Sequence, residues 1–217
     1  PDREPNRATV NSSGNRYRRC AAALCAALAT GLLASTTFLA TACHTQPDLP
    51  TFGTVPSFAL TDQSGKPFTL NGLAGTTWIA AFVFTRCPSA CPRVSRAMQL
   101  LQVKLKQRNA KVRLVSFSVD PDFDTPEVLR RYADEYKADT GTWSFVTGNA
   151  DTIRKTAEDG LKIAAEGKAD ETKADFGITH GTQLVLVDGQ GHIRGYYASN
   201  DDDAVTRLLE DATRLSS

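Results

Sequence analysis

The pattern of apolar and polar positions predicts alternating strands and helices from about residue 57 to the C-terminus. Short apolar runs bounded by turn residues indicate strands, whereas apolar residues that recur every three or four positions indicate helices. The predicted strands cover 58–60, 67–70, 77–84, 112–119, 143–146, 182–187 and 193–197. The predicted helices cover 92–107, a segment starting at Thr125-Pro126, 149–161, and a terminal segment opened by Asp201, Asp202 and Asp203.

This order of elements predicts an α/β fold with a central mixed sheet. Strands that are separated by crossover helices pair in parallel, and the hairpins at 58–70 and 182–197 add antiparallel strands. Helices are expected on both faces of the sheet, with a hairpin at the N-terminal end of the domain. The terminal aspartates are interpreted mainly as helix caps that complement the helix dipole, with a metal site as the alternative.

Two cysteines stand where the strand predicted at 77–84 passes into the next helix. Cys87 and Cys91 are separated by three residues, and a proline follows each of them. Because proline is tolerated at the first position of a helix, we expect the helix to begin at Pro92, with Cys91 as its cap. The free N–H groups and the dipole of a helix start favour a thiolate, the form that attacks disulfides and binds metals. A structural disulfide or a pair of buried thiols explains the spacing equally well.

The first 43 residues combine a basic segment with an uncharged one. Arginines within 16–19 precede a stretch rich in Ala and Leu at 20–43. Three interpretations compete: a signal peptide cleaved after Ala42, a lipoprotein signal whose Cys43 is lipidated, and an uncleaved membrane-spanning anchor. All three export the rest of the chain, to face the periplasm or the cell exterior. We favour lipidated Cys43, which would anchor the protein to a bacterial cell membrane, and then the uncleaved helix.

Length and composition fit one domain with an appendage. We expect 1–43 to be the signal or anchor segment, 44–56 an extended tether and 57–217 the folded domain. Residues 1–43 hold five of the 25 basic and two of the 24 acidic groups, so 44–217 carry a net charge of −2. This balance disfavours nucleic-acid binding. Cys20, Cys25 and Cys43 lie in the exported appendage, so Cys87 and Cys91 are the two cysteines of the domain, in an oxidising compartment.

One of the three histidines is placed to join these cysteines. His44 falls in the tether and His192 starts a hairpin strand, so both are expected to be solvated. His180 precedes the strand predicted at 182–187, and loops at this edge of a sheet converge near the carboxyl end of the first strand. Two thiolates and an imidazole suit copper(I) and also tolerate copper(II). A solvent-exposed loop histidine is the alternative.

From about Val55 to Leu209 the chain resembles the Sco/SenC family, copper-delivery proteins with a thioredoxin-like fold. Five segments carry the resemblance: VPSF at 55–58, FTRCPSACP at 84–92, SVDPDFDTPE at 118–127, residues 143–148, and THG at 179–181. The resemblance implies that Cys87, Cys91 and His180 are copper ligands. It also implies that the client is the copper-containing subunit of cytochrome c oxidase.

The chain departs from many family members around these ligands. Ser89-Ala90 replaces an acid in the cysteine loop, and Thr179-His180-Gly181 replaces Asp-His-Ser. Arg86 adds a positive charge that should favour the thiolate of Cys87. The chain has no proline after Pro126, so it lacks the cis-proline that thioredoxins place opposite their cysteines. The histidine in that loop suits metal binding better than disulfide exchange alone.

The leading hypothesis is therefore a metallochaperone rather than an enzyme, which holds copper and passes it to a partner by ligand exchange. The alternative is a thiol–disulfide oxidoreductase that keeps the client's cysteines reduced for metallation. Both need a thiol reductant as a partner. A peroxiredoxin-like peroxidase is a weaker third. Asp120 and Asp124 could tune the site or cap the turn before Thr125, and for Asp124 we favour the capping role.

Overall fold

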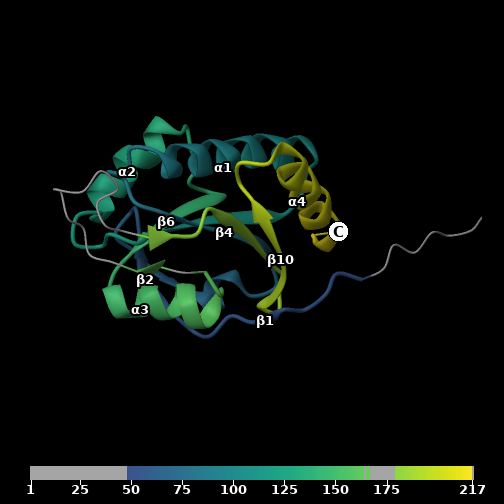
Figure 1. Cartoon of the computed structure of the whole chain (residues 1–217), viewed down its shortest axis with the longest axis horizontal. Coiled ribbons are helices and arrows are strands. Elements are labelled where there is room, and N and C mark those ends of the chain that lie inside the picture. Colours follow the sequence, from purple (N-terminus) through teal and green to yellow (C-terminus); the bar gives the residue numbers. More distant parts are fainter. Residues whose placement is uncertain (1–47, 164, 167–178, 217) are drawn as a thin grey trace, which may run out of the picture. The chain divides into compact units, whose positions relative to one another are not determined.

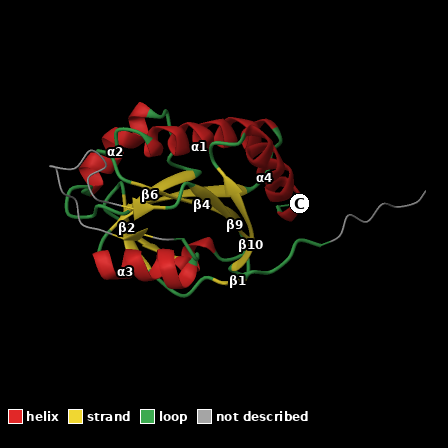
Figure 2. Ribbon diagram, in the orientation of Figure 1, coloured by secondary structure: helices red, strands yellow, loops and turns green. Residues whose placement is uncertain are grey.

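The computed structural model describes residues 48–163, 165–166 and 179–216. They form an eight-stranded sheet in the order β1-β10-β9-β4-β5-β6-β2-β3, together with a small β7–β8 pair (Figures 1 and 2). β4 pairs in parallel with β5, and β5 with β6, while the remaining pairs are antiparallel. The predicted mixed sheet is confirmed.

The strands of the large sheet are β1 (Gly53–Thr54), β2 (Ala59–Asp62), β3 (Pro67–Thr69), β4 (Thr77–Val83), β5 (Val112–Ser118), β6 (Trp143–Thr147), β9 (Gln183–Val187) and β10 (His192–Ala198). The small pair is β7 (Ala165–Glu166) and β8 (Thr179–His180). The helices are α1 (Ala90–Gln107), α2 (Pro126–Glu135), α3 (Ala150–Lys155) and α4 (Asp202–Leu215), with a 3-10 turn η1 (Leu70–Leu73) and a π-helical turn η2 (Thr156–Gly160).

The central strand β4 is buried on both faces. Its side chains alternate between two cores, because successive residues of a strand point to opposite sides of the sheet. Ile79, Ala81 and Val83 pack under α1, α2 and α4 on one face. Trp78 and Phe82 pack on the other face, which α3 covers (Figure 1). This explains why the sequence of β4 is a continuous apolar run rather than an alternating one.

Two helix starts follow their sequence signals. The Thr125 hydroxyl accepts a hydrogen bond from the Val128 N–H, and Pro126 is the first residue of α2. At α4, one carboxylate oxygen of Asp201 accepts from the N–H groups of Asp203 and Ala204. The capping interpretation of the terminal aspartates is thereby confirmed.

The predicted start of α1 is wrong by two residues. The helix begins at Ala90, with Ser89 in the cap position, so Cys91 lies in the first turn and Pro92 is the third residue. Proline fits there because the first N–H groups of a helix have no acceptor within the helix. The structure thus carries Cys91 on the helix itself and leaves Cys87 in the preceding loop, as expected.

The helix predicted at 149–161 is irregular in its second half. Asn149 caps α3 by accepting from the Thr152 N–H, and the π-helical turn η2 continues α3 to Gly160. Ile153 and Ala157 are buried as predicted.

The charged loop expected at 166–175 lies almost entirely outside the described residues. So do residues 1–47, where the signal, the anchor and Cys43 were predicted. Among the residues that are described, no helix is long and apolar enough to cross a membrane.

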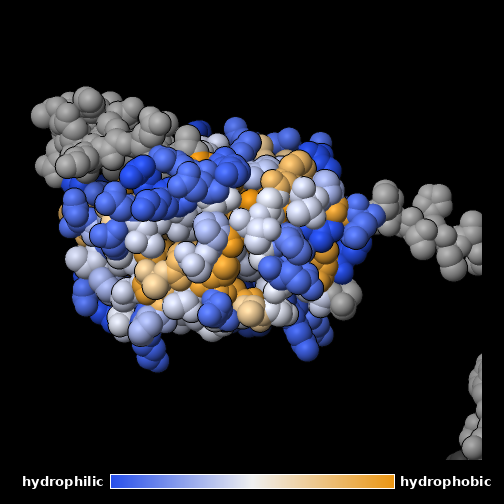
Figure 3. Space-filling view, turned by 90° about the horizontal axis from the view of Figure 1, so that it is seen from below, coloured by the Kyte–Doolittle hydropathy of each residue, from blue (hydrophilic) through white to orange (hydrophobic). Residues whose placement is uncertain are grey.

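The last residues before β1 are fastened to β10 by one arginine. Arg194 donates to the backbone oxygens of Leu49 and Pro50 and to the carboxylate of Asp48. The third guanidinium nitrogen, Nη1, donates to the Asp188 carboxylate at 2.9 Å. Only 12% of the Arg194 side chain and 6% of the Asp188 side chain are exposed, so this pair is shielded from solvent, whereas Asp48 is 92% exposed. On the α3 side of the domain, patches of apolar surface are interrupted by polar side chains (Figure 3).

Candidate metal centre

The two cysteines lie at the carboxyl end of β4, where the chain turns into α1. Cys87 is partly exposed and Cys91 is fully buried. The turn is closed by the Cys87 N–H, which donates to the Phe84 carbonyl at 3.2 Å. The Cys91 N–H donates to the Cys87 sulfur at 3.4 Å, and the Phe84 N–H donates to the Cys91 sulfur at 3.3 Å. Backbone donors therefore hold both sulfur atoms in one turn of chain.

The pKa of the buried Cys91 thiol differs from the sequence expectation, which was that the helix start would favour a thiolate. A hydrogen bond with the Cys87 side chain and burial raise the pKa of Cys91 far above its ordinary value, and the Phe84 N–H offsets only part of this. The start of a helix favours a thiolate, but here desolvation and the neighbouring sulfur outweigh it. Without a cation Cys91 thus keeps its proton. A bound metal ion would reverse this preference, because thiols are deprotonated when they ligate metals.

The backbone of His180 lies in a short strand just before β9. It belongs to β8, where it pairs with Ala165 of β7. The next residue, Gly181, packs closely: a Cβ atom there would lie 2.7 Å from a methyl carbon of Ile163. A larger residue at this position would require the Ile163 side chain to move. The side chain of His180 lies outside the description, so its role as a ligand stays a prediction. Within the described residues, no group of three His, Cys, Asp or Glu could hold a metal ion.

Arg86, next to Cys87, is engaged by a buried carboxylate. Its guanidinium donates to Asp120 at 2.8 and 3.2 Å and stacks over the Phe123 ring at 4.1 Å. Asp120 is only 4% exposed. The positive charge that was expected to act on Cys87 is therefore shared with Asp120, which weakens its influence on the thiol.

Asp124 connects the cysteine loop to β5. Its fully buried carboxylate accepts hydrogen bonds from the Thr85 N–H at 3.2 Å, the Thr85 hydroxyl at 2.5 Å and the Ser118 hydroxyl at 2.6 Å. The preference for a turn-capping role is therefore wrong, because all three donors belong to the ends of β4 and β5. Burial raises the pKa of Asp124 in spite of these hydrogen bonds. The sequence placed polar residues at two neighbouring strand ends, which was the available signal for this network.

We expect Asp124→Asn to lower the free energy of unfolding by about 1–3 kcal/mol, because its amide would face three donors. The pKa of Asp124 is raised above the ordinary 3.8 in the folded state, so the folded protein binds this proton more tightly than the unfolded chain. The wild type should therefore lose stability relative to the variant as the pH rises above about 4. Urea unfolding at pH 4, 5.5 and 7 measures both effects.

The exposed Asp122→Asn is the control for this measurement and should change stability by less than about 0.5 kcal/mol. A stability gap between wild type and Asp124→Asn that widens toward pH 7 would show that Asp124 is stabilised as a carboxylate. The account of its burial given above would then be wrong.

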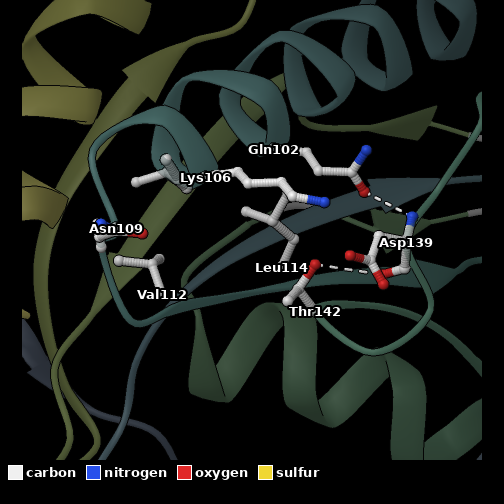
Figure 4. A pocket seen from close by; sticks show the side chains of 9 residues that line it. Gln102, Lys106, Asn109, Val112, Leu114, Asp139 and Thr142 are labelled. Atoms are coloured by element: carbon white, nitrogen blue, oxygen red, sulfur yellow. Dashed lines mark hydrogen bonds between the residues drawn. The ribbon is translucent and has the colours of Figure 1, made fainter.

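A separate pocket of about 240 Å³ lies at the far end of α1 (Figure 4). There the Gln102 side chain accepts from the Asp139 N–H at 2.7 Å, and the Thr142 hydroxyl donates to the Asp139 carbonyl. The lining contains no cysteine or histidine and a single acid; it consists of Gln102, Leu105, Lys106, Asn109, Ala110, Val112, Leu114, Asp139 and Thr142. It offers no ligand set for a soft metal.

Comparison with known proteins identifies the family of the chain. The sequence profile of the SCO1/SenC family matches residues 47–215, most of the chain. The chain belongs to the SCO1/SenC family. A putative copper-binding protein from Stutzerimonas stutzeri is 32% identical over 150 residues, which are 68% of this chain and 71% of that protein.

Solved structures of Sco proteins share the fold. A SCO1/SenC family lipoprotein from Bacillus anthracis str. Ames matches with a TM-score of 0.70 at 32% identity, over 76% of this chain and 96% of that one. BsSco, a member of the Sco family of cytochrome c oxidase assembly proteins in which a disulfide switch was identified, matches with a TM-score of 0.66 at 31% identity, over 78% and 99%. The mixed sheet flanked by helices is thus the thioredoxin-like fold of Sco proteins, as the sequence predicted.

Proposed function

We propose that this Sco protein binds copper through Cys87, Cys91 and His180 and delivers it to the copper-containing subunit of cytochrome c oxidase. The observation that carries the proposal is the pair of sulfurs held in one turn, with the Cys91 N–H 3.4 Å from the Cys87 sulfur. Two thiolates favour copper(I), and an imidazole as third ligand also allows copper(II). The Stutzerimonas relative named as copper-binding supports the choice of metal.

Binding and release follow from the protonation of the thiols. As copper enters, the two thiols give up their protons, and the bound cation takes over the electrostatic role of the protons. Cys87 is partly exposed, so it is the sulfur that a partner's ligand can approach first. Ligand exchange then proceeds from the exposed sulfur to the buried one, and the Cys91 thiol regains its proton once copper has left.

A second candidate function is a thiol–disulfide oxidoreductase that keeps the client's cysteines reduced. The closeness of the two sulfurs favours it, as does the disulfide switch identified in BsSco. In this function the two thiols are oxidised to one disulfide while the client's disulfide is reduced to two thiols. A separate thiol reductant then restores the pair. His180 is not needed for these steps.

For the rest of the chain we propose an export and anchoring role. Residues 1–43 would act as a lipoprotein signal that leaves lipidated Cys43, or as an uncleaved helix. The tether would be the residues before Asp48, because 48–50 are bound by Arg194 and β1 already pairs with β10. The Bacillus anthracis relative is described as a lipoprotein, which supports the first form. The domain would then face the periplasm or the cell exterior while attached to the membrane.

We expect the reduced protein to bind about one copper(I) and the oxidised protein to bind none, because a Cys87–Cys91 disulfide removes both soft ligands. Protein purified with and without reductant is analysed for copper, and its thiols are counted by mass after alkylation. Oxidation should remove two alkylation sites, and reduction should restore them. Two thiols that stay alkylatable under oxidising conditions would contradict the switch, whereas copper retained by the disulfide form would contradict the ligand set.

A further inference from the structure

The outer face of α1 carries a continuous stripe of exposed basic and apolar side chains. Arg93, Arg96, Leu100 and Val103 follow one another at intervals of three or four residues, so they share one face of the helix. The helix sequence contains two arginines and two lysines but no acid. Residues 44–217 carry a net negative charge, so the positive charge of this stripe is opposite in sign to that of the domain as a whole.

The two arginines of the stripe have no acidic partner. Both are exposed, and neither forms an ion pair with any described residue, whereas Arg86, Arg154, Arg194 and Arg214 do. They lie one turn apart, so two carboxylates on one partner segment can reach them together. Arginine binds carboxylates in a bidentate geometry, which makes this pair selective for acidic groups.

The apolar part of the stripe is also without a partner. Leu100 is 47% exposed and Val103 is 46% exposed, which makes them two of the four large apolar side chains exposed in the described part of the chain. The opposite face of α1 already fills the core through Met98 and Leu101. The fold therefore does not require apolar residues at Leu100 and Val103, and their exposure costs solvation free energy in the isolated domain.

A groove of about 300 Å³ runs beside these side chains. Its lining combines the start of α1 with the β10–α4 connection: Arg93, Arg96, Ala97, Leu100, Ser199, Asn200, Asp202 and Val205. Ser199 is 8% exposed, and its hydroxyl oxygen has no hydrogen-bond partner in the structure as described. Asp202 is the single acid of this lining, so the two arginines outweigh its charge.

We propose that this surface, the α1 stripe and its groove, docks the protein that exchanges copper with the thiols, through an acidic segment of that partner. Carboxylates of the segment pair with Arg93 and Arg96, and an aliphatic side chain between them enters the groove against Leu100 and Val205. The inference rests on the proposed function, because the groove lies at the same edge of the sheet as the thiols. Its residues Ser199 and Asn200 follow the carboxyl end of β10, and β10 and β4 end at the same edge because both pair antiparallel with β9.

The shape of the surface favours a protein over a lipid bilayer. A bilayer is bound by a broad apolar face that is flanked by many cations. Here the exposed apolar area of the stripe is limited to Leu100 and Val103, and the arginines line a groove whose other residues are mostly small or polar. A groove of this kind fits single side chains of a protein segment, as protein interfaces do at their centres.

Binding of the copper-free, reduced protein to the soluble copper-site domain of cytochrome c oxidase tests the proposal, with calorimetry or NMR titration as the measurement. The double variant Arg93→Glu/Arg96→Glu should weaken binding by about tenfold or more, and Leu100→Ser by several-fold. The control Arg130→Glu/Arg131→Glu makes the same charge change on exposed residues of α2, and it should leave affinity within about twofold. Wild-type affinity should also fall as NaCl is raised, because the contacts are ionic.

Copper(I) affinity, measured in all variants by chelator competition, separates this inference from the proposed function. The charge-reversed proteins should bind copper as the wild type does. Equal weakening by both double variants, or no binding of the wild type to the oxidase domain, would overturn the docking surface. Binding to vesicles of anionic phospholipid that Arg93→Glu/Arg96→Glu abolishes, without an effect on the oxidase domain, would assign the stripe to the membrane instead. Failure of the wild type to bind copper would refute the proposed function alone, since docking is measured without the metal.

Discussion

Replacing Cys87 by serine is expected to abolish tight copper(I) binding. A hydroxyl is a hard, poorly acidic ligand, so the variant would keep one soft donor where the wild type has two. The loss should exceed the roughly 10- to 100-fold effect that changes around a ligand usually have. Competition with a copper(I) chelator measures it. Cys87 is partly exposed, so the substitution should leave the fold intact.

The buried cysteine, Cys91, is tested by the same measurement of copper(I) binding. Cys91→Ser should show the same loss of copper, but it also removes the sulfur that accepts the Phe84 N–H, so its thermal unfolding is recorded alongside. Ser89→Ala changes the same loop and keeps both thiols, and it should bind copper as the wild type does. Unchanged copper affinity in a folded Cys87→Ser protein would remove the metal hypothesis.

His180→Ala is expected to separate the two candidate functions. A chaperone needs the imidazole as its third ligand, because two thiolates alone leave copper open to competing ligands. An oxidoreductase needs only the thiols, whose reactivity depends on their surroundings and on solvent access. The variant should therefore lose copper to a chelator that the wild type resists, while its disulfide still forms and is still reduced. Both properties are measured on one preparation, together with oxidase activity in cells that carry the variant.

His192→Ala is the matched control for this experiment. His192 begins β10, and its ring nitrogen lies 3.3 Å from Asp188 in the hairpin, so it should not affect copper. If His180→Ala retains copper and oxidase assembly proceeds normally, then His180 is not a copper ligand. The thiol oxidoreductase would in that case become the leading function.

Elements with strong local signals were predictable from the sequence. The buried strand β4, the two hairpins and the start of α2 at Thr125-Pro126 all depend on contacts within a few residues or on continuous apolar runs. The start of α1 was misplaced because proline is compatible with any position of the first turn, and the pattern alone does not choose among them. The choice is made by the turn that Cys87 closes onto Phe84.

The surroundings of the cysteines could be predicted less well, because they are set by residues far apart in the chain. Cys87 and Cys91 were recognised as one site by their spacing. The link from Asp124 to Thr85 spans 39 residues, and it depends on the pairing of β4 with β5. The raised pKa of Cys91 likewise follows from its hydrogen bond with the Cys87 side chain and from burial, which the sequence pattern does not reveal. Local spacing therefore indicated the two cysteines as candidate ligands, and tertiary packing determines the electrostatics of Cys91.

The fastening of residues 48–50 by Arg194 limits how far the domain can travel from its proposed lipid anchor. If the chain were loose up to Val55, twelve residues would separate the domain from Cys43, a reach of about 43 Å when fully extended. Because the chain is held from Asp48 onward, only five residues separate the domain from Cys43, and the maximum distance between them falls to about 18 Å. If Cys43 is lipidated as proposed, the shorter tether would confine the domain to a thinner layer of solution at the membrane. This would raise its effective concentration toward any acceptor held in the same membrane.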